Sequence, residues 1–193
     1  SGVFENISVF AFEAGEKRKN LDTIRDIYKF MLEKHLDRGS TVIGLGGGVC
    51  GDMAGFAAAT FMRGVNFIQI PTTLLAQVDS SVGGKVGVDF NGVKNIIGAF
   101  YQPGLVYTDI DTLITLPERE YMAGMAEVIK YGIINSKQFY DYIADNKEII
   151  KKGDKAALAE IIEKCCAIKA DVVKKDEKEG GLREILNFGH TVG

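Results

Sequence analysis

The chain has 193 residues, of which 46% are hydrophobic, and carries a formal net charge of −3. This length suffices for one ample domain or for parts of two. The charge argues against a nucleic-acid-binding surface, and without a run of eighteen apolar residues we expect no membrane span. We also find no signal peptide. The three cysteines have no metal-binding spacing, which favours buried thiols in a reducing cytoplasm.

The first half alternates strand and helix patterns. Residues 7–12 alternate in polarity and predict a strand. Asn20 is a suitable cap for an amphipathic helix. The apolar face of that helix comprises Leu21, Ile24, Ile27, Tyr28 and Met31. A buried strand at 41–45, an alanine-rich helix at 51–62 and strands at 65–70 and 105–109 follow. This order predicts right-handed parallel units.

Residues 68–100 break both the helical and the strand period. Glycines, a Thr-Thr pair and a Ser-Ser pair interrupt the apolar residues there. Glycine is expected where the backbone turns or closely approaches a ligand, and long loops without secondary structure are often functional. We therefore expect an irregular segment that forms one wall of an active site.

The second half is helical. Helices are expected at 118–133, 136–150 and 154–175. The apolar face of the last comprises Leu158, Ile161, Ile162, Cys165, Ile168 and Val172. The chain thus divides near residue 111 into an α/β domain, residues 1–110, and a helical domain, residues 111–193. Neither domain looks complete, because the sheet has few strands and the last residues stop inside a polar, glycine-rich segment.

A glycine motif follows the strand at 41–45. Gly46, Gly48 and Gly51 fit the spacing G-x-G-x-x-G between a strand and a helix, which suits a pyrophosphate at a helix N-terminus. The acidic ribose ligand usual about twenty residues later is absent. Nucleotide binding is favoured, but a turn that serves tight packing remains an alternative. Asp52 could act only as a favourable first-turn charge.

Polar residues interrupt the apolar helix at 118–133. Glu127, Lys130 and Tyr131 share one helical face at i, i+3 and i+4. Apolar neighbours indicate a largely buried helix, and a buried carboxylate needs a cation. The alternative is a surface ion pair, which contributes little to stability.

His190 is one of two histidines. His35 ends an amphipathic helix, where a cation suits the helix dipole. His190 follows Arg183 and Asn187 at spacings that place all three on one face if the segment is helical. With Glu127 it could form an oxygen–nitrogen metal pair. A catalytic zinc normally needs a third protein ligand, and the sequence offers no clear candidate.

Basic residues near these polar segments predict an anionic substrate carrying phosphate or carboxylate. They are Arg63, Lys85, Lys94, Lys130, Lys169 and Arg183. The alternative is a set of solvated surface cations.

Seven segments together resemble 3-dehydroquinate synthases, in order and over nearly the whole chain. They are GGGVCGDMAGF, FMRG, IPTTLLAQVDSSVGGKVGVD, KNIIGAFYQP, TLPERE, GMAEVIKYG and LREILNFGHT. The resemblance implies an α/β fold, with a partial Rossmann-like parallel-sheet domain that binds NAD and a partial α-helical domain that binds metal and substrate. It implies a cytoplasmic homodimer and a lyase dependent on NAD and zinc, or cobalt. Such enzymes convert a phosphorylated sugar acid, 3-deoxy-D-arabino-heptulosonate 7-phosphate, into 3-dehydroquinate and phosphate in the shikimate pathway of aromatic amino-acid biosynthesis.

The resemblance also implies roles for individual residues. Glu127 and His190 correspond to metal ligands. Catalytic positions are Asp79, Lys85, Asn95 and Lys130. Substrate-binding positions are Arg63, which would reach the neighbouring subunit's substrate, Lys169, Arg183 and Asn187. NAD contacts are Glu16, Lys19, Gly46, Gly47, Gly48, Asp52, Thr72, Thr73 and Lys94. The family pattern begins before Ser1 and continues past Gly193, where the third metal ligand is expected. We therefore interpret the chain as a fragment that is inactive alone.

Three alternatives remain open. A related sugar-phosphate cyclase would act on a substrate without a carboxylate, for which Lys169 and Arg183 would be superfluous. A metal-dependent polyol dehydrogenase would consume NAD stoichiometrically and would need fewer cations. A nucleotide-binding remnant would have no enzymatic activity.

Overall fold

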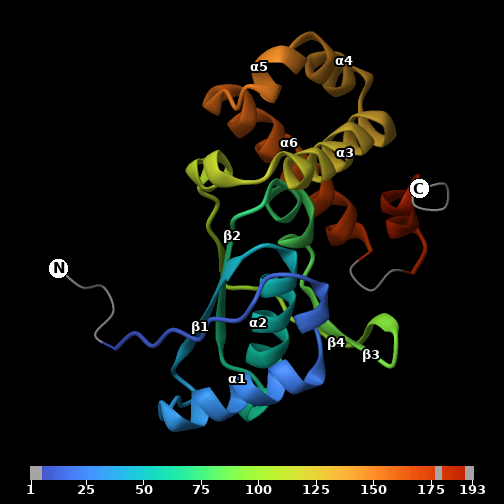
Figure 1. Ribbon diagram of the computed structural model, residues 1–193. Helices are drawn as coiled ribbons and strands as arrows, with labels where there is room; N and C mark the ends of the chain where they lie inside the picture. The colour runs from blue at the N-terminus through green and yellow to red at the C-terminus, as the bar shows by residue number, and fades with distance from the viewer. Residues whose placement is uncertain (1–5, 177–179, 190–193) are drawn as a thin grey trace.

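A computed structural model describes residues 6–176 and 180–189. An α/β part and a helical part stand one above the other in Figure 1, with α3 crossing close to the end of the sheet. The α/β part contains a parallel sheet of order β1-β2-β5, formed by β1 (Thr41–Gly46), β2 (Asn66–Pro71) and β5 (Leu105–Val106). The mixed α/β architecture expected from the sequence is confirmed.

Helices α1 (Leu21–Glu33) and α2 (Gly48–Thr60) accompany this sheet. Asn20 caps α1 as predicted, because its side chain accepts a hydrogen bond of 2.9 Å from the backbone N–H of Thr23. Helix α2 begins three residues earlier than expected and is followed by a 3-10 turn, η2 (Phe61–Arg63). It packs against β1 and β2 on one face of the sheet.

The prediction of a buried strand at 41–45 is wrong in one respect. The side chains of Ile43 and Leu45 are 42% and 63% exposed. β1 is an edge strand, and among the described residues α2 covers only one face of it. The strand expected at 105–109 is also shorter, since it pairs with β2 through two residues only.

The strand predicted at residues 7–12 is absent. A strand needs a hydrogen-bonded neighbour, and the described part of the chain provides none for this segment. Phe10 and Phe12 instead pack against the α/β core, and the Phe10 ring lies 5.4 Å from that of Phe30. The alternating polarity therefore reflects which side chains face that core.

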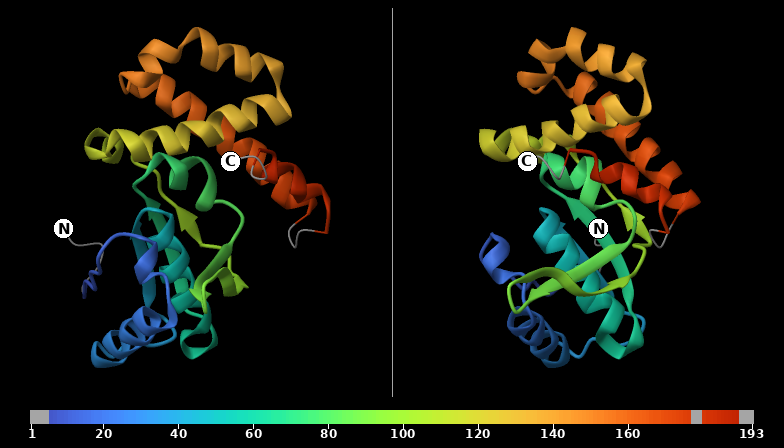
Figure 2. Two further views of the ribbon diagram at one scale, coloured as in Figure 1. Left: turned by 45° about the vertical axis from the view of Figure 1, so that its right-hand side comes forward. Right: turned by 90° about the vertical axis from the view of Figure 1, so that its right-hand side faces the viewer.

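The irregular segment expected at 68–100 is mostly ordered. It contains a π-helical turn, η3 (Ala76–Ser80), and an antiparallel hairpin of β3 (Lys85–Phe90) and β4 (Val93–Phe100). Asn91 and Gly92 connect the two strands with φ values of 50° and 79°, which suits a tight hairpin turn. The hairpin runs beside α2 (Figure 2), against which β3 packs.

The helical part follows the short β5. Its elements are η4 (Ile110–Thr115), α3 (Glu118–Asn135), α4 (Lys137–Asp145), α5 (Lys147–Lys151), α6 (Lys155–Lys175) and η5 (Leu182–Asn187). One further 3-10 turn, η1 (Glu16–Arg18), lies before α1 in the other part. The single helix expected at 136–150 is divided at Asn146, whose side chain donates a 2.9 Å hydrogen bond to the carbonyl of Tyr142. None of the described helices has an apolar stretch long enough to cross a membrane.

Two hydrophobic clusters form the interior. One joins α1, α2, β2 and β3, and the other joins α3, α4, α5 and α6. The predicted face of α6 lies in the second cluster. Leu74 and Val78, which precede or belong to η3, are also buried in that second cluster. The η3 turn at 76–80 thus packs against the helical part, although in the sequence it lies between strands of the α/β part. The domain boundary near residue 111 stays a prediction.

Candidate active site

The η3 turn is fixed by side chains from several segments. Gln77 is fully buried, and its Nε2 lies 3.2 Å from the Pro71 carbonyl, 3.1 Å from that of Asp109 and 3.1 Å from Thr112 Oγ1. Cys166 on α6 donates a 3.1 Å hydrogen bond to the Gln77 carbonyl. π-helical turns are rare and often occur at functional sites. Here the turn presents Asp79 to helices α3 and α6.

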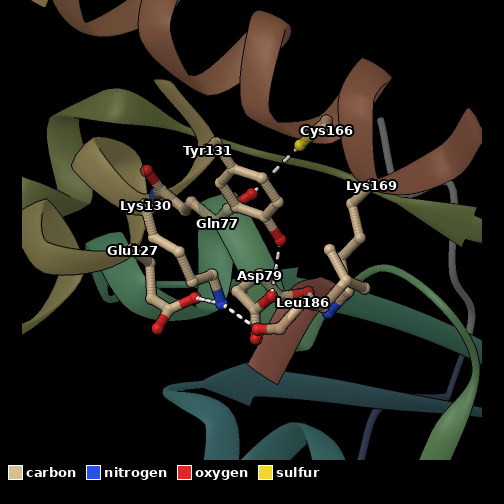
Figure 3. Close-up of polar contacts among 8 residues, drawn as sticks. All are labelled: Gln77, Asp79, Glu127, Lys130, Tyr131, Cys166, Lys169 and Leu186. Atoms are coloured by element: carbon tan, nitrogen blue, oxygen red, sulfur yellow. Dashed lines mark hydrogen bonds and ion pairs between the residues drawn. The ribbon is translucent and has the colours of Figure 1, made fainter. Parts of the chain in front are cut away.

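Asp79 is the centre of a polar network (Figure 3). Its Oδ1 accepts a 2.6 Å hydrogen bond from the hydroxyl of Tyr131 and lies 2.8 Å from Lys169 Nζ. Burial alone would raise the pKa of Asp79, but the charge of Lys169 and the hydrogen bonds from Lys169 and Tyr131 outweigh it, so this pKa is lowered. The carboxylate therefore stays ionised at neutral pH.

Glu127 and Lys130 form an ion pair on α3. Lys130 Nζ also donates a 2.7 Å hydrogen bond to the Leu186 carbonyl of η5. The two side chains are only 16% and 8% exposed, so the alternative of a surface ion pair is wrong. The expectation of a largely buried helix holds only in part, because Met125 and Val128 are buried whereas Ile129 and Ile133 are 39% and 53% exposed. Glu127, Lys130 and Tyr131 therefore lie on the inward side of α3, together with Met125 and Val128.

Arg183 adds a third buried cation. It is 2% exposed, and a Cβ built on Gly83 would lie 2.5 Å from its Nη2. A side chain at Gly83 would therefore collide with the guanidinium, and the φ of +112° at this position also favours glycine. Burial, and then the positive charges of Arg183 and Lys130, lower the pKa of Lys169 against the opposing effect of Asp79.

The predicted alignment of Arg183 with Asn187 is wrong. Their spacing of four suits an α-helix, but η5 is a 3-10 helix, in which residues three apart share a face. Leu186 consequently shares the buried face with Arg183, and Asn187 is exposed. His190 lies outside the described residues.

Two carboxylates and three cations therefore meet around η3. The carboxylates belong to Asp79 and Glu127, and the cations to Lys130, Lys169 and Arg183. Such a grouping of buried lysine and arginine side chains is typical of sites that bind anionic ligands.

The glycine turn lies at the N-terminus of α2. Gly47 is its N-cap and provides no side-chain hydrogen bond. Added Cβ atoms would lie 3.0 Å from Thr73 Cγ2 at Gly47 and 3.0 Å from Ser80 Oγ at Gly48. Ser80 Oγ is buried and has no hydrogen-bond partner among the described residues. The uncapped helix terminus and this hydroxyl fit the pyrophosphate of a dinucleotide.

Four of the expected NAD contacts pair with one another. Lys19, which is 5% exposed, lies 2.6 Å from Asp52, and Lys94 on the hairpin lies 3.5 Å from Glu16. Asp52 is the fifth residue of α2 and lies outside its first turn, so the interpretation as a first-turn charge is wrong. Burial raises the pKa of Asp52, against the opposing effect of Lys19. Thr72 adjoins the turn, since its N–H donates a 2.9 Å hydrogen bond to the Gly46 carbonyl.

Other expected residues lie on the surface. Lys85 on β3, Asn95 on β4 and Arg63 in η2 are exposed. Among the described residues, no group of three or more histidine, cysteine, aspartate or glutamate side chains could hold a metal ion. Glu127 is the one expected metal ligand that this part of the chain includes. The described residues therefore do not by themselves form a metal site.

Sequence reasoning missed several members of the network. Gln77, Ser80 and Cys166 were assigned no role at the site. Cys166 and Lys169 are three residues apart and both contact η3. That spacing on α6 is a signal that could have linked this cysteine to the site.

Two family models together cover most of the chain. The model described as 3-dehydroquinate synthase N-terminal matches residues 9–123, and the one described as 3-dehydroquinate synthase C-terminal matches residues 124–193. The 3-dehydroquinate synthase of Acetivibrio thermocellus is 65% identical over 97% of this chain and 52% of its own length. That of Ruminiclostridium cellulolyticum is 58% identical over 100% of this chain and 53% of its own length. The chain thus spans about half the length of these relatives.

Solved structures of sugar-phosphate cyclases have the same fold. ValA, a 2-epi-5-epi-valiolone synthase from Streptomyces hygroscopicus with NAD+ and Zn2+ bound, has a TM-score of 0.87 and 26% identity, covering 93% of this chain and 51% of its own. A 2-deoxy-scyllo-inosose synthase with carbaglucose-6-phosphate, NAD+ and Co2+ has a TM-score of 0.80 and 29% identity, covering 94% of this chain and 49% of its own.

Proposed function

We propose that this chain, which belongs to the 3-dehydroquinate synthase family, is part of an enzyme that converts 3-deoxy-D-arabino-heptulosonate 7-phosphate into 3-dehydroquinate and phosphate. The observation that carries the proposal is the cluster around η3. It combines three buried cations with two carboxylates and adjoins the N-terminus of α2 through Ser80. A substrate with a phosphate at one end and a carboxylate at the other has anionic groups that lysine and arginine side chains bind.

NAD is the proposed cofactor. Gly47, Gly48 and Ser80 would receive its pyrophosphate, and Thr73 would lie beside it. ValA and the 2-deoxy-scyllo-inosose synthase, both structurally similar, have NAD+ bound. Bound NAD would remove a hydride from the substrate and later return it, so it would be required without being consumed.

The proposed metal is zinc, with cobalt as the alternative. ValA has Zn2+ bound and the 2-deoxy-scyllo-inosose synthase has Co2+. Glu127 offers a carboxylate ligand that a divalent cation could take from Lys130. His190 and further ligands would have to come from outside the described residues.

The described side chains have separable roles in this proposal. Lys130, Lys169 and Arg183 bind the anionic groups of the substrate and hold it in a reactive pose. Arg183 can bind a carboxylate through two parallel hydrogen bonds, which lysine cannot reproduce. Asp79, kept ionised by its neighbours, accepts hydrogen bonds from substrate hydroxyl groups.

Further properties of the family are part of the same proposal. The enzyme would be a carbon–oxygen lyase, since phosphate leaves by elimination. It would work as a cytoplasmic homodimer in which exposed Arg63 reaches the substrate of the neighbouring subunit. The exposure of Arg63 and the three free cysteines support these assignments. Sedimentation of the full-length protein would test the dimer.

The second candidate function is that of a related cyclase. The structural likeness to ValA favours it, and substrates of this kind would lack the carboxylate. The burial of both Lys169 and Arg183 in the cluster favours the carboxylate-bearing substrate. Incubating the full-length protein with the heptulosonate phosphate, and with the corresponding phosphate lacking a carboxylate, would distinguish the two by phosphate release.

A further inference from the structure

Both side-chain contacts of Asp79 are made by the same carboxylate oxygen. Tyr131 donates to Oδ1 at 2.6 Å, and Lys169 Nζ lies 2.8 Å from the same atom (Figure 3). No described residue forms a hydrogen bond or ion pair with Oδ2. The side chain of Asp79 is nevertheless 27% exposed. One oxygen is therefore held by protein, and the other can accept a hydrogen bond from a ligand.

The two donors come from rigid positions. Lys169 Nζ is itself anchored, because it also donates a 2.8 Å hydrogen bond to the backbone carbonyl of Asp79. Tyr131 is fully buried within the helical core, so its ring cannot follow a moving carboxylate. Two fixed donors restrict the terminal torsion of an aspartate, which is otherwise broad.

The hydroxyl of Tyr131 can act only as a donor here. Burial, and then the charge of Asp79, raise the pKa of Tyr131 far above its usual value. The phenol therefore stays protonated at neutral pH. Its hydrogen bond to Asp79 keeps one direction and does not switch.

We propose that Tyr131 is a positioning residue that holds Oδ1 of Asp79 so that Oδ2 accepts a hydrogen bond from a substrate hydroxyl. The inference rests on the proposed function, because it takes a polyhydroxylated sugar acid as the ligand of this cluster. It adds a residue that does not itself touch the substrate. Lys169 alone would leave the carboxylate free to turn about the remaining contact.

A matched control lies on the same helix. The hydroxyl of Tyr121 donates a 2.6 Å hydrogen bond to the Ile150 carbonyl, a contact between α3 and α5. Tyr121→Phe thus removes a phenol hydrogen bond of the same length without touching Asp79. If a loss of substrate affinity or kcat/KM merely reflects the packing of α3, it should appear in both Tyr131→Phe and Tyr121→Phe.

The test is a double-mutant cycle in the full-length protein. The variants are Tyr131→Phe, Asp79→Asn, their combination and Tyr121→Phe. Asparagine keeps an oxygen that Tyr131 and Lys169 can hold but places an NH2 group where Oδ2 was, which cannot accept a hydrogen bond. Affinity for the heptulosonate phosphate is measured by calorimetry on NAD-free protein, in which hydride transfer cannot begin. The ratio kcat/KM is measured with NAD, and thermal unfolding checks that each variant is folded.

We expect Tyr131→Phe to lower kcat/KM at least about tenfold in the parent protein, but less than about twofold when Asp79→Asn is already present. The substrate affinity measured by calorimetry should likewise fall more in the parent than in the Asp79→Asn variant. Tyr121→Phe should leave both quantities within about twofold of the parent. This inference alone would be overturned if the parent is active and Tyr131→Phe either has no effect or lowers kcat/KM by the same factor with and without Asp79→Asn. A parent that releases no phosphate would refute the proposed function together with the inference.

Discussion

Lys169 contacts Asp79 twice, since its Nζ lies 2.8 Å from the carboxylate Oδ1 and 2.8 Å from the backbone carbonyl of the same residue. The two residues are separated by 90 positions in the chain. This double contact ties α6 to the η3 turn. It also places a cation and an anion of the proposed site on elements from the two halves of the chain.

Lys169→Met should strongly destabilise the protein. Removing one partner of a buried ion pair leaves the other charge unpaired and typically costs about 3–5 kcal/mol. The measurement is the free energy of unfolding of the full-length protein in urea. Lys175→Met is the control on the same helix, because the pair of Lys175 with Asp171 is 59% and 60% exposed and should contribute less than about 1 kcal/mol. Similar losses in both variants would contradict the buried pair.

The network predicts a specific dependence of stability on pH. The pKa of Asp79 is lower in the folded state than its ordinary value of about 4. The ionised carboxylate therefore makes its full contribution to the free energy of unfolding above about pH 4, and this contribution is lost as the pH falls through the folded pKa. Asp79→Asn removes this titration. The unfolding free energy of the parent should therefore fall relative to that of the variant between about pH 5 and pH 2. A difference independent of pH would show that the carboxylate is not stabilised in its ionised form.

Gly48→Val should abolish NAD binding. A Cβ at this position would already lie 3.0 Å from Ser80 Oγ, and the larger side chain would occupy the space where the pyrophosphate must approach the backbone. Calorimetric titration of the full-length protein with NAD measures the effect. Gly104→Ala is the control, because a Cβ there would make an ordinary contact of 3.7 Å with the Phe67 carbonyl. Unchanged NAD affinity in Gly48→Val would remove this turn from the cofactor site.

Arg183→Lys should lower turnover of the carboxylate-bearing substrate at least about tenfold, equivalent to about 1.4 kcal/mol. Lysine keeps the charge but cannot bind a carboxylate through two parallel hydrogen bonds. Steady-state kinetics of the full-length enzyme tests this, while its zinc content and NAD affinity should match those of the parent. Equal turnover would remove the main reason for preferring this substrate over one that lacks the carboxylate.

Local sequence patterns predicted the regular elements well. Asn20 and the apolar spacing after it located α1, and the face of α6 was correct because both depend on one helix and its neighbours. The hairpin is a feature that the sequence analysis missed although Asn91-Gly92 is a strong hairpin signal, because the many glycines around it also suit an irregular loop. The prediction of a strand at 7–12 is wrong, because alternating polarity cannot show whether a neighbouring strand is available for pairing.

For the candidate site, the sequence indicated residue identities more than geometry. The resemblance pointed to Asp79, Lys130, Lys169 and Arg183, which the structure brings together around one turn. It could not reveal that η5 is a 3-10 helix, which turns Asn187 outward. The pairing of Glu127 with Lys130 was foreseeable from their spacing, but its burial was not, because it depends on the packing of α3 against other elements.

The most direct test of the proposed function is to follow phosphate and NADH together after mixing the full-length protein with NAD, zinc and the heptulosonate phosphate. Hydride that is removed and later returned predicts one phosphate released per substrate consumed, with many turnovers per NAD and no net gain in NADH absorbance. NADH that accumulates in proportion to substrate, or substrate that remains without phosphate release, would contradict the assignment as a 3-dehydroquinate synthase.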